Sequence, residues 1–316
     1  MLVVMEPDAQ EAEIIAVVEK MLELGFSPSR TTGHHQTVVA GIGAGLEDLA
    51  TLQAMPGVWD VYAVSTSYTL AQRHSKRDGT IVRIGEHRIG GNRLIAFVRP
   101  LSHGAIAPEA FCAALPPDGL SAVIVPSLDA QSAAWREATA ARGFALVHQL
   151  PGPLCTSLDA FLVTGSMVSD KAALREVAAT QKPVILERPV EATLDEFLTA
   201  AEEFLSHGNA NVVLSERGIR TSERRAPVGF DVLTIPVLRR LTHLPVIVDA
   251  GRILRHAERW AVARAAAAAG ADGVILDVDS GAGGHAHPRA VSVVDLAAVL
   301  EEAHSLAKAI RMKAQK

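Results

Sequence analysis

Eight short runs of strand-forming residues, separated by helical patterns, occupy the sequence from Leu94 onward. Strands that alternate with helices build a parallel sheet, and eight such units in about 220 residues close into a (β/α)8 barrel. The third helix is expected to be almost missing, because Pro151-Gly-Pro153 leaves little room before the fourth strand. The predicted strands are Leu94–Val98, Ala122–Val125, Ala145–Leu150, Ala160–Val163, Val184–Leu186, Val212–Leu214, Val246–Val248 and Gly273–Val278.

A different order of elements, β-α-β-β-α-β, is predicted for residues 1–66. The apolar residues between Ile14 and Leu22 recur at helical spacing, and Gly25 is placed to end that helix. This order is that of a ferredoxin-like domain. Residues 67–92 are predicted to form a polar linker with a β-hairpin, and residues 93–316 the barrel. The other predicted elements of the small domain are strands Leu2–Met5, Thr37–Ile42 and Val58–Val64 and helix Glu47–Met55.

Composition excludes several classes of protein. The 316 residues are 49% hydrophobic and 21% charged, which is typical of a globular chain with a large core. The net charge of −5 gives no general attraction to nucleic acid or to an anionic membrane. Cys112 and Cys155 are the only cysteines, so neither a disulfide framework nor a cysteine zinc site is expected. The sequence also lacks Walker, Rossmann and nucleophile-elbow motifs.

The N-terminal segment is too acidic, and its apolar run too short, for a signal peptide. The most apolar later stretch, residues 261–276, is interrupted by Arg264 and Asp272, so it predicts a helix followed by a strand rather than a membrane span. We therefore expect a cytoplasmic protein with neither a membrane nor a nucleic-acid partner.

Two segments carry a family resemblance. Residues 211–221 read Asn-Val-Val-Leu-Ser-Glu-Arg-Gly-Ile-Arg-Thr, and residues 243–249 read His-Leu-Pro-Val-Ile-Val-Asp. They resemble the sixth and seventh barrel strands of the 3-deoxy-D-arabino-heptulosonate 7-phosphate (DAHP) synthases, in the short microbial branch with a ferredoxin-like N-terminal domain. The resemblance implies that fold along the whole chain. That family condenses phosphoenolpyruvate with erythrose 4-phosphate and uses a divalent metal.

The resemblance also locates four metal-binding positions, of which this chain keeps one suitable residue. The family's cysteine after strand one matches Leu101, and its histidine after strand seven matches Arg252. After strand eight the family's Glu-Val-His-Pro-Asp holds two ligands, and this chain reads Asp277-Val-Asp-Ser-Gly281, which keeps one carboxylate and loses the other. We count only Asp277 as a residue of the right class, and one carboxylate does not make a protein metal site. We expect no metal and no other cofactor.

The family's substrate-binding positions are also replaced. The long Lys-Pro-Arg-Thr loop after strand two is absent, and strand four ends in Gly165-Ser-Met167 instead of Gly-Ala-Arg. Strand five ends in Glu187-Arg-Pro189 where the family has Lys-Arg-Gly, so a carboxylate would face an anionic substrate. Only Glu216-Arg-Gly-Ile-Arg-Thr221 matches throughout, and its Arg217 corresponds to a phosphate-contacting arginine. For Arg217 and Arg220 the alternative is a structural ion pair with Glu216 or a neighbouring carboxylate.

The charged residues at the strand ends allow two interpretations. We hypothesise that the guanidinium groups of Arg99 and Arg252 pair with Asp249 and Asp277 and replace the lost cation. In the favoured interpretation these residues close the barrel mouth as a satisfied charge network. In the alternative they line a ligand site or an active site, with His148 as general base. The candidate ligand-binding residues are Arg99, Arg188, Glu216, Arg217, Arg220, Asp249, Arg252 and Asp277, and the candidate catalytic residues are His148, Glu187 and Asp279.

The paired histidines elsewhere, His34 with His35 and His285 with His287, are interpreted as solvent-exposed. The leading functional prediction is a pseudoenzyme-like DAHP synthase relative that binds a small anionic molecule or a partner and regulates aromatic biosynthesis. The second is a metal-independent lyase or aldolase acting on a carboxylate or phosphate, and the third is an active DAHP synthase. From the resemblance we also expect self-association into a homo-oligomer, and allow an aromatic amino acid as a ligand of the N-terminal domain.

Overall fold

The computed structural model describes residues 1–32, 37–42, 49–62, 68–76, 78–91, 93–101, 106–126, 132–155, 157–224, 228–252, 258–279 and 290–314. The chain forms two compact units, Met1–Thr66 and Ser67–Lys316. Each unit has its own apolar core, and each is described separately below. The predicted histidine pairs, His34 with His35 and His285 with His287, lie outside the described residues.

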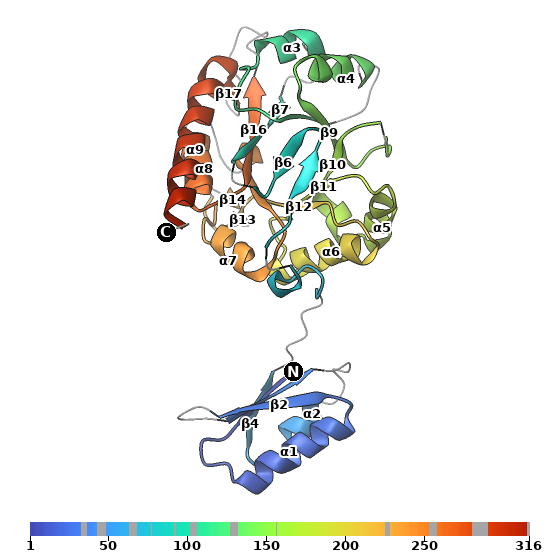
Figure 1. Ribbon diagram of the computed structural model, residues 1–316, viewed down its shortest axis with the longest axis vertical. Helices are drawn as coiled ribbons and strands as arrows, with labels where there is room; N and C mark the ends of the chain where they lie inside the picture. The colour runs from blue at the N-terminus through green and yellow to red at the C-terminus, as the bar shows by residue number, and fades with distance from the viewer. Residues whose placement is uncertain are drawn as a thin grey trace. The chain divides into compact units, whose positions relative to one another are not determined.

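The small unit has the predicted ferredoxin-like fold. Its four strands form an antiparallel sheet in the order β2-β3-β1-β4 (Figure 1). The buried side chains of Val3, Met5, Ile14, Val17 and Met21 join the sheet to the first helix. The elements are β1 (Leu2–Met5), α1 (Glu11–Glu23), β2 (Ser27–Thr32), β3 (Thr37–Ile42), α2 (Leu49–Gln53) and β4 (Val58–Tyr62).

Gly25 ends α1 as predicted. Its φ of +80° is a left-handed conformation, which glycine adopts without steric cost. The Gly25 N–H donates to the Leu22 carbonyl at 3.0 Å, and the Phe26 N–H donates to the Met21 carbonyl at 2.9 Å. This Schellman arrangement satisfies the last carbonyl groups of the helix and turns the chain into β2.

The large unit is a closed barrel of eight parallel strands, which confirms the predicted fold class. The strands follow the order β15-β12-β11-β10-β9-β8-β7-β16, and a β15–β16 pairing closes the ring. Five strands continue one or two residues beyond their predicted ends, so charged residues predicted to follow those strands lie within them. The strands are β7 (Ile95–Pro100), β8 (Ala122–Val125), β9 (Ala145–Leu150), β10 (Ala160–Val163), β11 (Val184–Glu187), β12 (Val212–Glu216), β15 (Val246–Asp249) and β16 (Gly273–Asp279).

Helices surround this barrel (Figure 1). No helix separates β9 from β10 in the described residues 151–155 and 157–159, as the two prolines predicted. Within the described residues, no helix is both long and apolar enough to cross a membrane. The α-helices are α3 (Pro108–Ala114), α4 (Ser132–Ala141), α5 (Lys171–Ala179), α6 (Leu194–Ser206), α7 (Thr234–Leu241), α8 (Glu258–Ala268) and α9 (Val293–Ala314), with short 3₁₀ segments η1 (Arg73–Ser75), η2 (Gly165–Ser169) and η3 (Ala250–Arg252).

The predicted hairpin closes one end of the barrel. Its strands, β5 (Val82–Ile84) and β6 (His87–Ile89), pack their buried side chains against the first inward-facing residues of the barrel strands, including Ile95 and Ala122. This end is therefore filled by apolar side chains. The opposite end, where the strands terminate, is the face at which barrel proteins bind their ligands.

Candidate functional site at the barrel mouth

Alternation along each strand determines which side chains reach the barrel interior. Ile185, Val213, Ile247 and Ile275 belong to the inner apolar cluster, whereas their neighbours pack against the helices. Because strand side chains alternate between the two faces, residues two positions further along point inward at the mouth. Continuing this pattern, the inward-facing residues are Arg99, Glu187, Ser215, Arg217, Asp249, Asp277 and Asp279. His148, Arg188 and Glu216 face outward.

Arg99, at the end of β7, lies between two carboxylates. Its Nε donates to Asp277 Oδ1 at 2.7 Å, and its Nη1 and Nη2 donate to the two oxygens of Asp249 at 3.0 and 3.2 Å. The Arg99 side chain is 4% exposed and Asp249 is fully buried. Burial alone would lower the pKa of Arg99, but the two carboxylates outweigh it and hold that pKa above its usual value. Arg99 is thus a fixed cation, neutralised on both sides.

Gly251 makes room for this arrangement. A Cβ at position 251 would lie 2.6 Å from Asp277 Oδ1 and 3.0 Å from the Asp277 backbone nitrogen. Any larger residue would push the Asp277 carboxylate away from Arg99. The glycine in Asp249-Ala-Gly-Arg252 therefore leaves the space that the ion pair between Arg99 and Asp277 needs.

Arg252 does not make the predicted pairing. Its backbone N–H donates to Asp249 Oδ1 at 3.2 Å, but its guanidinium bonds Gln149 Oε1 at 3.4 Å in an exposed position. Arg99 alone makes the predicted hydrogen-bonded pairs with the carboxylates, while Arg252 acts on Asp249 and Asp277 only through its charge. Gln149 was not predicted as a site residue, although alternation from Val147 places it inward.

The buried Glu187 carboxyl, at the end of β11, lies between a guanidinium and a second carboxyl. Its Oε1 accepts a hydrogen bond from Arg217 Nη1 at 2.9 Å, and Glu187 is fully buried. Its Oε2 has no donor among the described residues, and the Glu187 carboxyl is within hydrogen-bonding reach of Asp249. Burial, followed by the charge of Asp249, raises the pKa of Glu187 to about 7, while Arg217 opposes the shift. Glu187 and Asp249 therefore form a carboxyl pair that holds one proton near neutral pH.

Arg217 connects this buried layer to a cavity of about 1020 Å³. Its side chain is 26% exposed, and its buried Nε has no acceptor among the described residues. Among the other charged lining residues, Arg220 pairs with Glu191, and Lys171 pairs with Glu203 at 3.5 Å. Asp195 accepts a hydrogen bond from the Tyr68 hydroxyl, and Glu196 accepts one from the Thr193 backbone N–H at the start of α6. The cavity is lined by η2 and the start of α5, by Pro189–Ala192 and one face of α6, and by Arg217, Arg220 and Val228.

Arg188 and Glu216 support Arg217 from the outer face. Arg188 Nε lies 3.0 Å from Glu216 Oε2, and the Gly218 N–H donates to Glu216 Oε1 at 2.6 Å. Burial raises the pKa of Glu216 to about 7, which Arg188 opposes. Gly218 has a φ of +95°, and a Cβ there would meet the Gly229 carbonyl oxygen at 2.6 Å. The pair thus fixes a turn next to Arg217 and does not line the cavity, which differs from the ligand-binding role predicted for both residues.

The structure does not bring His148 to the barrel mouth. The side chain faces outward with Leu146 and Leu150, and its ring contacts Phe161 edge-on at 6.5 Å between centroids. Neither ring nitrogen has a hydrogen-bond partner among the described residues, and burial lowers the pKa of His148. Because the imidazole faces away from the barrel interior, it cannot serve as general base beside Glu187. Asp279 is buried at the end of β16, and its predicted role remains a prediction.

The described residues of the mouth do not fit a divalent metal. Leu101 offers no ligand atom, and Arg99 occupies the space between the two carboxylates that a cation would neutralise. Across the described part of the chain, no three side chains from His, Cys, Asp and Glu gather closely enough to hold a metal ion. A positive guanidinium hydrogen-bonded to both Asp249 and Asp277 would also repel an incoming cation.

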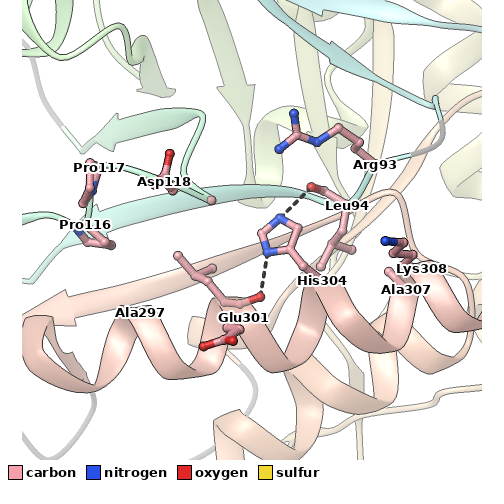
Figure 2. A pocket seen from close by; sticks show the side chains of 12 residues that line it. Arg93, Leu94, Pro116, Pro117, Asp118, Ala297, Glu301, His304, Ala307 and Lys308 are labelled. Carbon is pink, nitrogen blue, oxygen red and sulfur yellow. Dashed lines mark hydrogen bonds between the residues drawn. The ribbon is translucent and has the colours of Figure 1, made fainter.

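A second cavity, of about 680 Å³, lies at the opposite end of the barrel (Figure 2). His304 of α9 lies in it and contacts two backbone carbonyl oxygens, of Leu300 at 2.6 Å and of Leu94 at 3.0 Å. Figure 2 shows Arg93 and Lys308 near this ring, and neither has a partner among the described residues. His304 fastens α9 to the start of β7, far from the strand ends that carry Arg217.

The fold and the charged mouth define a (β/α)8 barrel protein with a ferredoxin-like N-terminal unit. The family model described as the DAHP synthetase I family matches residues 158–307, and that of the DAHP synthase ferredoxin-like domain matches residues 1–66. The chain therefore belongs to the DAHP synthase family, in the branch with this N-terminal domain.

Similar proteins come from Thermotoga maritima. A phospho-2-dehydro-3-deoxyheptonate aldolase is 25% identical over 303 residues, covering 88% of each chain. The crystal structure of that type of aldolase superposes with a TM-score of 0.78 at 24% identity, covering 98% of this chain and 97% of the other. A truncated 3-deoxy-D-arabino-heptulosonate 7-phosphate synthase gives 0.71 at 25% identity, covering 77% of this chain and 98% of the other.

Proposed function

We propose that this DAHP synthase relative binds a small anionic molecule at Arg217 and does not catalyse metal-dependent condensation of phosphoenolpyruvate with erythrose 4-phosphate. The observation that carries the proposal is the contrast between Arg99, which two carboxylates neutralise, and Arg217, which is partly exposed, borders a cavity and bonds the single carboxyl group of Glu187. A regulatory role in aromatic biosynthesis is the context that fits a binding protein of this family.

Two features support the loss of condensation. Arg99 stands where the mouth would need a metal cation, and no residue at Leu101 or Arg252 replaces the missing ligands. Glu187 brings a carboxyl group to the end of β11, where an anionic substrate would approach. The positive charge that the family pattern places there is therefore lost, which weakens the binding of a highly anionic substrate.

Two other features support retention of an anion site. The turn after β12 keeps its whole motif, and the outward Arg188–Glu216 pair holds that turn in place. Arg217 presents its guanidinium to a cavity large enough for a small organic acid or phosphate. A guanidinium with a free edge binds such groups through two parallel hydrogen bonds.

A second candidate function is a metal-independent lyase or aldolase. The Glu187–Asp249 carboxyl pair favours it, because a glutamic acid that titrates near pH 7 beside a ligand cavity suits proton transfer. His148, directed away from the mouth, contributes nothing to such chemistry. Active DAHP synthesis is the third candidate, favoured by the aldolase relative that aligns over most of the chain.

The decisive assay supplies phosphoenolpyruvate, erythrose 4-phosphate and Mn²⁺ to the purified full chain and follows phosphate release and product. We expect no product above background, and multiple turnovers would overturn the proposal. A thermal-shift panel of phosphoenolpyruvate, sugar phosphates, shikimate intermediates and aromatic amino acids, with and without Mn²⁺, then searches for the ligand. Stabilisation by an anion that Arg217→Ala abolishes and Arg220→Ala preserves would support the Arg217 site.

The N-terminal unit and the assembly form a separate part of the proposal. In relatives the ferredoxin-like domain can sense aromatic amino acids, and we extend this role, together with self-association, to the present chain. Stabilisation by an aromatic amino acid that persists in Arg217→Ala would support a ligand of the small unit. Light scattering of the purified chain measures its oligomeric state, and a monomer at all concentrations would contradict self-association.

A further inference from the structure

We propose that Glu187 couples anion binding at Arg217 to proton uptake, so that an anion enters the site together with one proton from solvent. This inference rests on the anion site proposed above and identifies Glu187 as the residue that sets the charge of that site. The DAHP synthase pattern has a lysine at this position, so the coupling would be a property of this chain.

The bonding of Asp249 determines where the proton resides. Asp249 accepts from Arg99 through both oxygens, and also from the Arg252 backbone N–H. Burial acts to raise the pKa of Asp249, but Arg99 outweighs it and holds that pKa below its usual range. Asp249 therefore stays ionised, and the proton of the pair belongs on Glu187. Glu187 Oε2, which has no donor among the described residues, becomes the group that donates to Asp249.

The same proton controls the charge that Arg217 presents to the cavity. When Glu187 is ionised, its Oε1 both bonds and neutralises Arg217. When Glu187 is protonated, Oε1 still accepts that hydrogen bond, but the guanidinium charge is no longer balanced there. An anion in the cavity then meets the guanidinium charge of Arg217 without an ionised carboxylate beside it. The affinity for a neutral ligand does not depend on whether Glu187 is protonated, so the coupling favours negatively charged ligands.

The charges facing Glu187 from the neighbouring strands agree with this account. They are the guanidinium groups of Arg217 on the β12 side and Arg99 on β7, and the carboxylates of Asp249 on β15 and Asp277 on β16. Asp279 also faces inward on β16, and the charge of Arg252 acts on Asp249 and Asp277. Burial raises the pKa of Asp277 as well, but Asp277 bonds Arg99 directly, whereas Glu187 lies beside the charge of Asp249. The Glu187 pKa of about 7 means that the proton exchanges in the physiological range.

The experiment uses two probes that keep a constant charge from about pH 6 to about pH 8.5, sulfate and pyruvate. Each is titrated into the full chain by calorimetry near pH 7, in two buffers that differ in ionisation enthalpy. We expect net proton uptake of up to roughly one half per anion near pH 7, rising towards about one at higher pH, with a Kd that weakens towards tenfold per pH unit above about pH 7. Binding without proton uptake and with a pH-independent Kd would overturn the inference while leaving the anion site intact.

Variants separate this coupling from a general effect of burial. Glu187→Gln mimics the protonated carboxyl, because its amide N–H can donate to Asp249 and its oxygen can accept from Arg217. We expect it to bind both probes without proton uptake and, at about pH 8.5, at least tenfold more tightly than the wild type. Glu216→Gln tests the other buried glutamate that titrates near this pH, which faces outward and holds the turn at Arg217 in place. Its affinity for the probes can change for that structural reason, but each anion that it binds should still be accompanied by proton uptake.

The wild-type proton count stands even if Glu187→Gln folds poorly. If proton uptake is lost in Glu216→Gln but preserved in Glu187→Gln, the proton goes to Glu216 and not to Glu187. That result would refute the inference. If neither probe binds, or if Arg217→Ala binds them unchanged, the proposed function fails and the coupling fails with it.

Discussion

Arg99 and Arg217 occupy the same barrel mouth, yet their surroundings differ in every respect that matters for ligand binding. Arg99 is 4% exposed and makes hydrogen bonds to two carboxylates. Arg217 is 26% exposed and bonds one carboxyl group, that of Glu187. Its buried Nε–H has no acceptor among the described residues. The number of fixed counter-charges therefore distinguishes an arginine that holds a fold together from one that is available to a ligand.

The largest expected effect tests the structural half of this comparison. Arg99→Met leaves Asp249 and Asp277 buried without their shared partner, and removing one member of a buried ion pair costs about 3–5 kcal/mol. Arg217→Met should cost about 1–2 kcal/mol, because Glu187 can then keep its proton. Urea unfolding monitored by the fluorescence of Trp135, which is buried in the barrel, measures both.

Adding Asp277→Asn to Arg99→Met removes one of the stranded charges and should recover part of the lost stability. If Arg99→Met and Arg217→Met lower the free energy of unfolding equally, the comparison fails, because Arg217 would then stabilise the fold as much as Arg99 does.

An intermediate effect concerns pH. The pKa values of Glu187 and Glu216 are raised to about 7 by burial from an ordinary value of 4.5, so the folded state holds protons that the unfolded chain releases. The stability they contribute is complete below the ordinary value and is lost as pH rises through 7. Between about pH 6.5 and pH 8.5 the free energy of unfolding should fall by about 1 kcal/mol for each glutamate.

This window avoids the range below pH 6.5, where the lowered pKa values of His148 and His243 act in the opposite direction. Glu187→Gln and Glu216→Gln should each flatten part of the slope, as measured by urea unfolding at several pH values. A stability that increases across the window would show that neither glutamate retains a proton in the folded protein.

The smallest effect is expected at Arg220, whose ion pair with Glu191 is exposed on both sides. Solvent screens such pairs, so Arg220→Ala should change neither the unfolding midpoint nor the affinity for sulfate measurably. A clear loss of sulfate binding would instead make Arg220 part of the anion site and would remove the contrast between paired and available arginines.

Much of the fold was predictable because buried strands in this chain are apolar runs flanked by turn residues. The bounds of β8, β9 and β10 agree with prediction for this reason. Strands such as β11 and β16 extend further, because the parallel ladder continues through Glu187, opposite Ser215, and through Asp279, opposite Ser292. A hydrophobic pattern ends at the first charge, whereas the hydrogen-bonded strand does not.

The site was less predictable, because side-chain direction and long-range pairing decide it. Alternation from the inward Val147 would have shown that His148 faces outward and Gln149 inward. The Glu187–Asp249 contact depends on the closed barrel, in which β12 lies between the two strands. Its inward residue there, Ser215, is small enough to let the two carboxyl groups approach. No local pattern in the sequence contains that information.

The cation at the centre of this mouth is covalently part of the polypeptide. A chelator cannot extract Arg99, competing ions cannot displace it, and its supply never depends on the concentration of free metal around the protein. The negative charges of Asp249 and Asp277 therefore have their guanidinium partner as soon as β7, β15 and β16 come together. The barrel is synthesised with this counter-ion already in its chain.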